Sequence, residues 1–209
     1  LKNRLNEMSD VTLYGFPLST YVRTVHMVLI EKGVDFEQQP YAPNTDEMRA
    51  VSPTGKVPAF SHGDFMLFES LAMIKYIDEA FNGPALQPTD VKKRAIMNQW
   101  ISYINAYVFS TMVHEIVLFR FEIRPMDQAT LDAAIPKTKE QLALLEASLS
   151  NTPYLAGDQI SLADFVLYPI LALLGMTPEA SLLTAYPAVS AWKKSMEERA
   201  SITASAPPM

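Results

Sequence analysis

Polar residues that could bind a ligand stand where a strand-like segment gives way to a helical one. Ser19 and Thr20 follow the strand-like residues 11–16 and precede a helical pattern that ends at Gly33. The N–H groups and the dipole at the start of a helix favour an anion, so a hydroxyl at this place could help to bind one. Serine and threonine are also the preferred N-cap residues. One of the two hydroxyls could therefore cap the helix while the other acts on a ligand.

Two further groups, Val57-Pro58 and Glu69-Ser70, stand at the start of a strand-like and a helical segment. Position alone favours an ordinary trans edge proline at Pro58, because only about 5–6% of X–Pro bonds in folded proteins are cis. A carboxylate and a hydroxyl at a helix start serve as cap and dipole partner. The same two groups would also suit the ammonium and carboxylate of a bound amino acid. The residues alone leave both interpretations open.

Several kinds of chemistry are excluded by composition. The chain has no cysteine, which rules out disulfides, cysteine nucleophiles and thiolate metal sites. His26, His62 and His114 lack ligand spacing, so no metal is expected. Neither a GxSxG nucleophile turn nor a glycine-rich phosphate loop occurs. The net charge of −6 without a basic block argues against nucleic acid as a partner, and the longest apolar run, 165–176, is too short to span a membrane.

The elements that must position these residues change in type along the chain. The first third alternates strand and helix patterns, in the order β-α-β and then β-β-α, which is that of a thioredoxin-like half. The predicted elements are strands over 11–16, 34–40, 57–60 and 65–68, with helices from Ser19 or Thr20 to Gly33 and over 69–81.

The second half has helical patterns alone. Ser161-Leu-Ala-Asp164 is a capping-box pattern that begins one of these helices, and Pro136 either begins or kinks another. We therefore expect an α/β thioredoxin-like domain followed by an all-helical domain. The expected divisions are a leader or disordered segment over 1–9, a thioredoxin-like domain over 10–82, a linker over 83–89 and a helical domain over 90–209. Residues 1–10 have no apolar signal core, which predicts a cytoplasmic location.

Together these segments resemble the cytosolic glutathione transferases, from about Val11 to Ala200. The resemblance rests on the order and spacing of several motifs. They are Phe16-Pro-Leu-Ser-Thr20 with Arg23, Pro53-Thr-Gly-Lys-Val-Pro-Ala-Phe60, Phe68-Glu-Ser70 with Tyr76-Ile77, Tyr154-Leu-Ala-Gly-Asp158 with Ser161-Leu-Ala-Asp164, and Tyr186-Pro187 with Trp192. The Ser-Thr-x-x-Arg run is similar to the serine-type classes, in particular to phi-like bacterial members. In tyrosine-type relatives the catalytic tyrosine would align with Gly15, and the absence of cysteine excludes the cysteine-type classes.

This resemblance implies a role for each candidate residue. Ser19 would donate a hydrogen bond to the glutathione sulfur and favour the thiolate. A cis Pro58 would leave the Val57 backbone free to pair with the cysteinyl part of glutathione, and Glu69 and Ser70 would hold the γ-glutamyl end.

Two positions depart from the phi-like pattern. Lys56 stands where glutamine is common and is expected to make a polar contact with glutathione. Pro43-Asn44 stands roughly where a His-Lys pair is directed at the glycyl end. The resemblance therefore leaves open how the glycyl carboxylate is held.

The implied function is glutathione transfer, in which the thiolate attacks an electrophilic carbon of a small hydrophobic co-substrate. Glutathione and this electrophile would be the two co-substrates, and no metal, nucleic acid or membrane is expected to take part. The resemblance also implies a cytoplasmic homodimer with a role in detoxification. The expected walls of the co-substrate pocket are Phe16, Leu18, Tyr107, Met112 and Ile116. The alternatives are a ligand-binding or assembly protein of the same fold without turnover, and a specialised isomerase or dehalogenase that uses the same thiolate.

Overall fold

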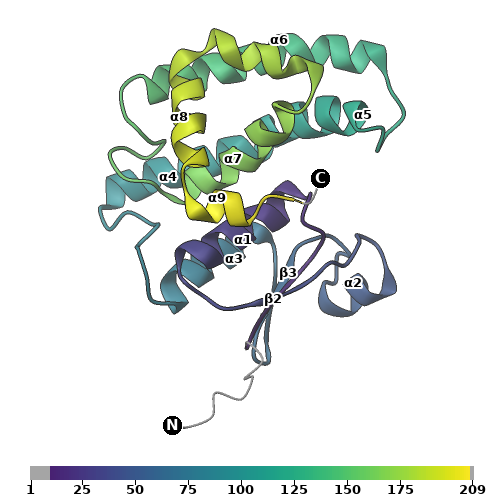
Figure 1. Cartoon of the computed structure of the whole chain (residues 1–209), viewed down its shortest axis with the longest axis vertical. Helices are drawn as coiled ribbons and strands as arrows, with labels where there is room; N and C mark the ends of the chain where they lie inside the picture. The colour runs from purple at the N-terminus through teal and green to yellow at the C-terminus, as the bar shows by residue number, and fades with distance from the viewer. Residues whose placement is uncertain (1–9, 208–209) are drawn as a thin grey trace. The chain divides into compact units, whose positions relative to one another are not determined.

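The protein is described by a computed structural model over residues 10–207 and divides into two compact units (Figure 1). Among the described residues, the first unit comprises 10–85 together with 200–207, and the helical unit is Leu86–Arg199. The leader expected over 1–9 lies outside the described residues. An α/β unit and an all-helical unit are the predicted fold class, which is confirmed.

The first unit is built on a four-stranded mixed sheet with the strand order β2-β1-β3-β4. Its strands are β1 (Val11–Tyr14), β2 (Glu37–Gln39), β3 (Ala59–His62) and β4 (Phe65–Phe68), and its helices are α1 (Thr20–Glu31), α2 (Asp46–Val51), α3 (Ser70–Ala80) and α9 (Ala200–Ala204). Strand β1 pairs in parallel with β2 and antiparallel with β3, and β3 pairs antiparallel with β4. The hairpin turn is shorter than expected, because residues 61 and 62 continue β3.

Helices α1 and α3 pack against each other and lie side by side in Figure 1. Helix α1 buries Val22, Val25 and Leu29 completely, and α3 buries Ile74 and Ile77 completely. These are the apolar positions that recur at helical spacing in the sequence, so the hydrophobic pattern alone orients both helices. This packing fixes the two helix starts that carry the candidate polar residues.

The C-terminal helix α9 belongs to the first unit, although the sequence placed it in the helical domain of 90–209. The buried guanidinium of Arg23 on α1 donates from Nη2 to the carbonyl oxygen of Ile202 at 3.2 Å. The Ser201 hydroxyl donates to the Glu31 carboxylate at 2.5 Å. The boundary of the helical domain is thus corrected, because α1 holds the last helix through contacts that no local pattern reveals.

The helical unit is organised around α7, which packs against α4 and η1. Its elements are α4 (Val91–Tyr103), the π-helical η1 (Ile104–Val117), α5 (Leu118–Arg120), α6 (Gln128–Leu149), α7 (Leu162–Leu174), the 3₁₀-helical η2 (Pro178–Ala185) and α8 (Pro187–Glu197). Pro136 lies inside α6 and does not begin it, since Asp127 caps the helix. None of the helices described in residues 10–207 has the length and apolar character that a bilayer crossing needs.

The capping box at Ser161 and Asp164 is present and has a wider role than capping. The fully buried Asp164 carboxylate accepts hydrogen bonds from the Leu155 N–H at 3.1 Å, the Ser161 N–H at 2.9 Å, the Ser161 hydroxyl at 3.0 Å and the Trp192 Nε1–H at 3.0 Å. Burial raises the pKa of this carboxyl above its ordinary value, while the four hydrogen bonds work in the opposite direction. Asp164 therefore joins the start of α7 to two other segments of the helical unit.

Candidate active site

Gly15 brings the segment before Ser19 close to Val57. Its φ is +141°, and a Cβ at this position would lie 2.5 Å from Val22 Cγ2 and 3.1 Å from Val57 Cβ. The Gly15 N–H donates to the Gln39 carbonyl oxygen at 2.8 Å, which holds the end of β1 against β2. Only glycine permits this close approach, and the loop that carries Ser19 is thereby placed beside the loop that carries Val57.

Ser19 is the N-cap of α1, and Thr20 is its first helical residue. The Val22 N–H donates to the Ser19 hydroxyl oxygen at 3.5 Å. Thr20 is only 5% exposed, and its carbonyl oxygen accepts from the Thr24 hydroxyl at 2.9 Å. A hydroxyl that accepts one bond still has its own hydrogen to donate. Ser19 can therefore cap the helix and donate to a ligand.

The Val57–Pro58 peptide bond is cis, as the resemblance implies. Val57 is half-buried and precedes β3. Within residues 10–207, the Val57 N–H and C=O make no hydrogen bond to another residue. An unpaired backbone edge of this kind can pair with an extended peptide as an added strand does.

Glu69 and Ser70 lie at the junction of β4 and α3. Glu69 has φ 70° and ψ 104°, and its side chain makes no capping hydrogen bond. A non-glycine residue at positive φ is uncommon, costs about 1–3 kcal/mol and tends to occur at functional sites. Ser70 is the first residue of α3 and is 7% exposed. Burial raises the pKa of Tyr21 on α1 above its ordinary value, and the negative charge of Glu69 raises it further.

Lys56 is exposed and lies in a loop that contacts the start of α2. The Lys56 N–H donates to the Thr54 hydroxyl at 3.3 Å. The Asn44 N–H donates to the Gly55 carbonyl oxygen at 2.8 Å, and Arg49 Nη2 donates to Asn44 Oδ1 at 3.0 Å. Sequence reasoning did not select Arg49. The available signal was its positive charge, seven residues before Lys56 in the chain.

The expected wall residues fall into two groups. Phe16 and Leu18 are half-buried in the segment before Ser19. Tyr107 is 59% exposed and lies in a groove of about 440 Å³ in the helical unit, between η1 and α6. Met112 and Ile116 have no exposed surface. The role of these five residues as pocket walls stays a prediction. For the buried Met112 and Ile116, it requires movement of the side chains that cover them.

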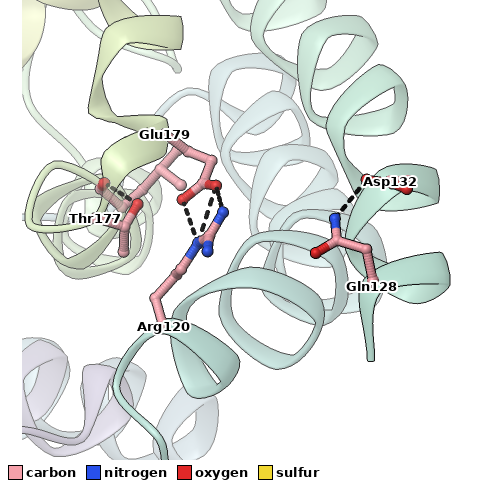
Figure 2. A network of polar contacts seen from close by, with 6 residues as sticks. Arg120, Gln128, Asp132, Thr177 and Glu179 are labelled. Atoms are coloured by element: carbon pink, nitrogen blue, oxygen red, sulfur yellow. Dashed lines mark hydrogen bonds and ion pairs between the residues drawn. The ribbon is translucent and has the colours of Figure 1, made fainter. Parts of the chain in front are cut away.

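A second polar cluster lies in the helical unit and joins α5 to η2. Figure 2 shows the Arg120 guanidinium facing the Glu179 carboxylate, with Nε at 3.0 and 3.1 Å from the two oxygens and Nη2 at 2.5 Å from Oε1. On α6, the Gln128 amide donates to Asp132 at 2.7 Å. A cavity of about 650 Å³ lies beside this pair, lined by Phe119, Arg120, Glu122, Ile123, Arg124, Pro125, Met126 and Pro178. Arg120 and Glu179 neutralise each other and hold α5 against η2.

The histidines do not form a metal centre. His62 Nδ1 lies 2.9 Å from the Tyr76 hydroxyl, and His114 meets the edge of the Phe109 ring. Burial, and Arg23 in second place, lower the pKa of His26. Within residues 10–207, no group of three histidine, aspartate or glutamate side chains is close enough to hold a metal ion.

The sequence of this chain matches family models and known proteins over most of its length. The model of the glutathione S-transferase N-terminal domain matches residues 13–85, and that of the C-terminal domain matches residues 100–200. The chain is 35% identical over 205 residues to glutathione S-transferase 1 of Zea mays, covering 93% of this chain and 95% of that protein. It is 35% identical over 196 residues to the probable glutathione S-transferase GSTF2 of Oryza sativa subsp. japonica, with 88% and 90% covered.

Solved structures agree with these relatives. Glutathione S-transferase I from maize, in complex with an atrazine glutathione conjugate, superposes with a TM-score of 0.84 at 33% identity, covering 93% of this chain and 95% of that one. Sequence and structure thus match over nearly the full length of both proteins. The chain belongs to the glutathione S-transferase family.

Proposed function

We propose that this glutathione transferase is a serine-type enzyme in which Ser19 activates the glutathione thiol. The observation that carries the proposal is the hydroxyl at the start of α1, which keeps its hydrogen for a ligand while its oxygen accepts from Val22 at 3.5 Å. The proposal is supported by the close approach at Gly15, which brings the segment before Ser19 against Val57. The thiol of glutathione can then contact Ser19, its cysteinyl backbone can pair with Val57, and its γ-glutamyl head group can contact Glu69 and Ser70.

The proposed contacts follow the chemistry of glutathione from end to end. The Glu69 carboxylate takes the γ-glutamyl ammonium, and the Ser70 hydroxyl with the N–H groups at the start of α3 takes the γ-glutamyl carboxylate. The backbone of Val57 pairs with the cysteinyl residue. Ser19 donates to the sulfur, the thiol proton passes to solvent, and the thiolate forms a bond to the electrophilic carbon as the leaving group departs.

The energy that Ser19 must supply is within reach of one hydroxyl. A free thiol of pKa near 8.5 is only about 3% ionised at pH 7, and lowering the pKa by about two units ionises roughly three-quarters of it. Two units correspond to about 2.7 kcal/mol. One charge-assisted hydrogen bond supplies about 1.5–3 kcal/mol, and a helix N-terminus about 0.3–1 kcal/mol more.

The serine-type assignment is also supported by Gly15, the position that aligns with the catalytic tyrosine of tyrosine-type relatives. A side chain at Gly15 would collide with Val22 Cγ2 at 2.5 Å. Tyr14, one residue earlier, lies with its hydroxyl 3.4 Å from the Ser61 hydroxyl on β3. We place the enzyme among the phi-like members, including bacterial ones, on the Ser-Thr-x-x-Arg run that ends at Arg23.

A homodimer is the proposed assembly. Strand β4 is the last strand of the sheet, and it exposes Phe65 by 47%, Met66 by 41% and Phe68 by 44%. Apolar side chains grouped on an edge strand are typical of a surface that another chain covers. A second copy of this chain is the proposed partner. A monomer mass in light scattering would contradict it.

The cytoplasm is the proposed location, because glutathione keeps thiols reduced there and is at hand as substrate. Detoxification of small hydrophobic electrophiles is the proposed role. It is supported by the maize relative that was solved with an atrazine glutathione conjugate. Phe16 and Leu18, next to Ser19, are the proposed contacts of the first unit with the electrophile.

The deciding experiment measures glutathione affinity and then turnover with aryl halides, epoxides, isothiocyanates and hydroperoxides. The expected result is binding with conjugation of an aryl halide, epoxide or isothiocyanate, or with reduction of a hydroperoxide to its alcohol as two glutathiones are oxidised to the disulfide. Tight binding of glutathione without turnover on any of them would favour the non-catalytic carrier. Failure of the wild-type protein to bind glutathione would contradict the proposed site itself.

A further inference from the structure

Helix α9 packs against α1 and is hydrogen-bonded to it both near its start and at its end (Figure 1). Near the start of α1, the buried Arg23 guanidinium donates from Nη2 to the Ile202 carbonyl oxygen at 3.2 Å and from Nε to the Ser205 hydroxyl at 3.5 Å. At the end of α1, the Ser201 hydroxyl donates to the Glu31 carboxylate at 2.5 Å. A segment 179 residues further along the chain therefore holds α1 in place.

The Arg23 side chain is suited to bind the end of a helix. Ile202 lies in the last turn of α9, where carbonyl oxygens lack partners within the helix and the helix dipole is negative. A guanidinium carries five N–H donors in one plane, so it can bind this carbonyl oxygen and the Ser205 hydroxyl together. Ile202 and Ser205 are both buried. Burial of a charge is costly unless it is hydrogen-bonded, and α9 supplies these bonds.

Arg23 is also bonded directly to Ser19. The Arg23 N–H donates to the Ser19 carbonyl oxygen at 2.9 Å, across the first turn of α1. This bond is much shorter than the one at the Ser19 hydroxyl, which accepts from the Val22 N–H at 3.5 Å. Arg23 thus contacts Ser19 through its main chain and α9 through its side chain. The position of the weakly capped Ser19 hydroxyl therefore depends on a turn of helix that α9 helps to hold.

A second buried cation holds the other end of α1. The Lys32 ammonium donates to the Asp78 carboxylate at 3.1 Å and to the carbonyl oxygens of Asp78 and Pro84, each at 3.0 Å. These contacts tie the end of α1 to α3 and to the segment that follows it. They lie at the opposite end of α1 from Ser19, so the Arg23 contact is the one of the two that can govern the serine.

We propose that Arg23 is a positioning residue that couples the docked helix α9 to Ser19, so that full activation of the glutathione thiol requires α9 to stay bound to α1. This inference rests on the proposed function. Arg23 itself does not touch glutathione in this account. When its bonds to α9 are lost, the first turn of α1 moves more freely and the Ser19 hydroxyl points at the sulfur less often. The thiolate is then less favoured, while the groups that bind the peptide are unchanged.

The test separates the α9 contact near Ser19 from the contact at the far end of α1. Arg23→Gln removes the guanidinium, and Arg23→Lys keeps a charged donor without the planar fork. Ile202→Lys leaves α1 unchanged but places a charge at a buried apolar position, which undocks α9. Ser201→Ala is the matched control, because it removes a hydrogen bond between α9 and Glu31.

Each full-length variant is compared with the wild type in three measurements. Thiolate absorbance of the glutathione complex against pH gives the pKa of the bound thiol. Steady-state kinetics give kcat and the KM for glutathione. Thermal unfolding gives stability, and amide hydrogen exchange in α9 reports whether this helix is docked.

Arg23→Gln and Ile202→Lys are both expected to raise the pKa of the bound thiol and to lower kcat at neutral pH about 3- to 10-fold, with recovery at high pH. The KM for glutathione is expected to stay within about twofold, because the residues proposed to bind the peptide are unchanged. Arg23→Lys is expected to restore part of kcat. Ser201→Ala is expected to lower thermal stability slightly and to keep the thiol pKa of the wild type.

Two results would overturn the inference while leaving the proposed function intact. One is a wild-type thiol pKa in Arg23→Gln, even with lower thermal stability, which would make Arg23 a purely structural residue. The other is a raised thiol pKa in Arg23→Gln but not in an Ile202→Lys variant whose α9 is undocked, which would mean that Arg23 acts without α9. A wild-type complex whose thiol titrates like free glutathione would instead overturn the proposed function.

Discussion

The Val22 N–H donates to the Ser19 hydroxyl oxygen at 3.5 Å, a long hydrogen bond at the start of α1. N–H···O bonds in proteins are usually 2.7–3.2 Å long, so this cap is weak. The weak cap is compatible with the proposed function, because a loosely held hydroxyl can turn its hydrogen toward a sulfur without giving up a strong bond. The same serine can therefore cap the start of α1 and donate its hydrogen to a ligand.

Two substitutions of Glu69 distinguish the contribution of its carboxylate to glutathione binding from the effect of its positive φ on stability. Glu69→Ala and Glu69→Gly both remove the carboxylate, and each is expected to weaken glutathione binding by about 1.5–3 kcal/mol. Because glycine accepts the φ of 70° at this position, the glycine variant is expected to be more stable than the alanine variant by about 0.5–1 kcal/mol. Calorimetric titration and thermal unfolding measure the two effects.

The matched control for Glu69 is Glu79→Ala, an exposed carboxylate on the same helix, which is expected to bind glutathione normally. Unchanged affinity in both Glu69 variants would remove this residue from the site.

Loss of the buried Asp164 carboxylate is expected to destabilise the helical unit strongly. Asp164→Ala leaves the Leu155 N–H and the Trp192 Nε1–H without their partner. Each unsatisfied buried donor costs about 1–3 kcal/mol, so a total of about 2–6 kcal/mol is expected for the two. Asp158→Ala is the control, because that carboxylate is 79% exposed and pairs with Lys93 at the surface. Chemical denaturation gives both values, and similar losses for the two variants would contradict the role given to Asp164.

Several features of both units follow from local signals. The apolar spacing of α1 and α3, the hairpin before α3 and the capping box at Ser161 and Asp164 are all set by residues near in sequence. The cis bond at Pro58 was implied by the resemblance and could not be derived from position.

Features that depend on distant partners were missed. Helix α9 returns to the first unit because Arg23 reaches the carbonyl oxygen of Ile202, and a backbone acceptor carries no signal in residue type. Arg49 was missed as well, because its orientation depends on Asn44 and Gly55, which lie outside its own helix. The apolar residues Ile104, Val108, Met112 and Ile116 of the π-helical η1 recur every four positions. An α-helix gives this spacing too, so periodicity could not distinguish the two.

The Arg120–Glu179 pair is expected to make stability depend on pH on the acid side. Burial alone would raise the pKa of Glu179, but the hydrogen bonds from Arg120 outweigh it and hold the pKa below the ordinary value of 4.5. The folded state therefore binds fewer protons than the unfolded state. The stabilisation is present above about pH 4.5 and is lost as the pH falls through the folded pKa.

Glu179→Gln is expected to lower the free energy of unfolding by about 1 kcal/mol at pH 7, since solvent screens part of the pair. The difference from the wild type is expected to shrink as the pH falls below the ordinary value. Glu115→Gln, which breaks a more exposed pair with Lys137, serves as control and is expected to show little effect at any pH. Denaturation curves that keep a constant difference at acid pH would contradict this account.

The most direct test of Ser19 is a titration of thiolate absorbance in the enzyme–glutathione complex against pH. Ser19→Ala is expected to keep glutathione affinity within a few fold, because Val57, Glu69 and Ser70 still bind the peptide. Its bound thiol is expected to titrate at a higher pKa than in the wild type. Turnover at neutral pH is then expected to fall by about 10- to 100-fold, in line with the loss of one charge-assisted hydrogen bond, and to recover partly at high pH. Thr20→Val, which removes the buried neighbouring hydroxyl, is expected to titrate like the wild type. A Ser19→Ala complex that titrates like the wild type while Thr20→Val shifts would contradict the assignment.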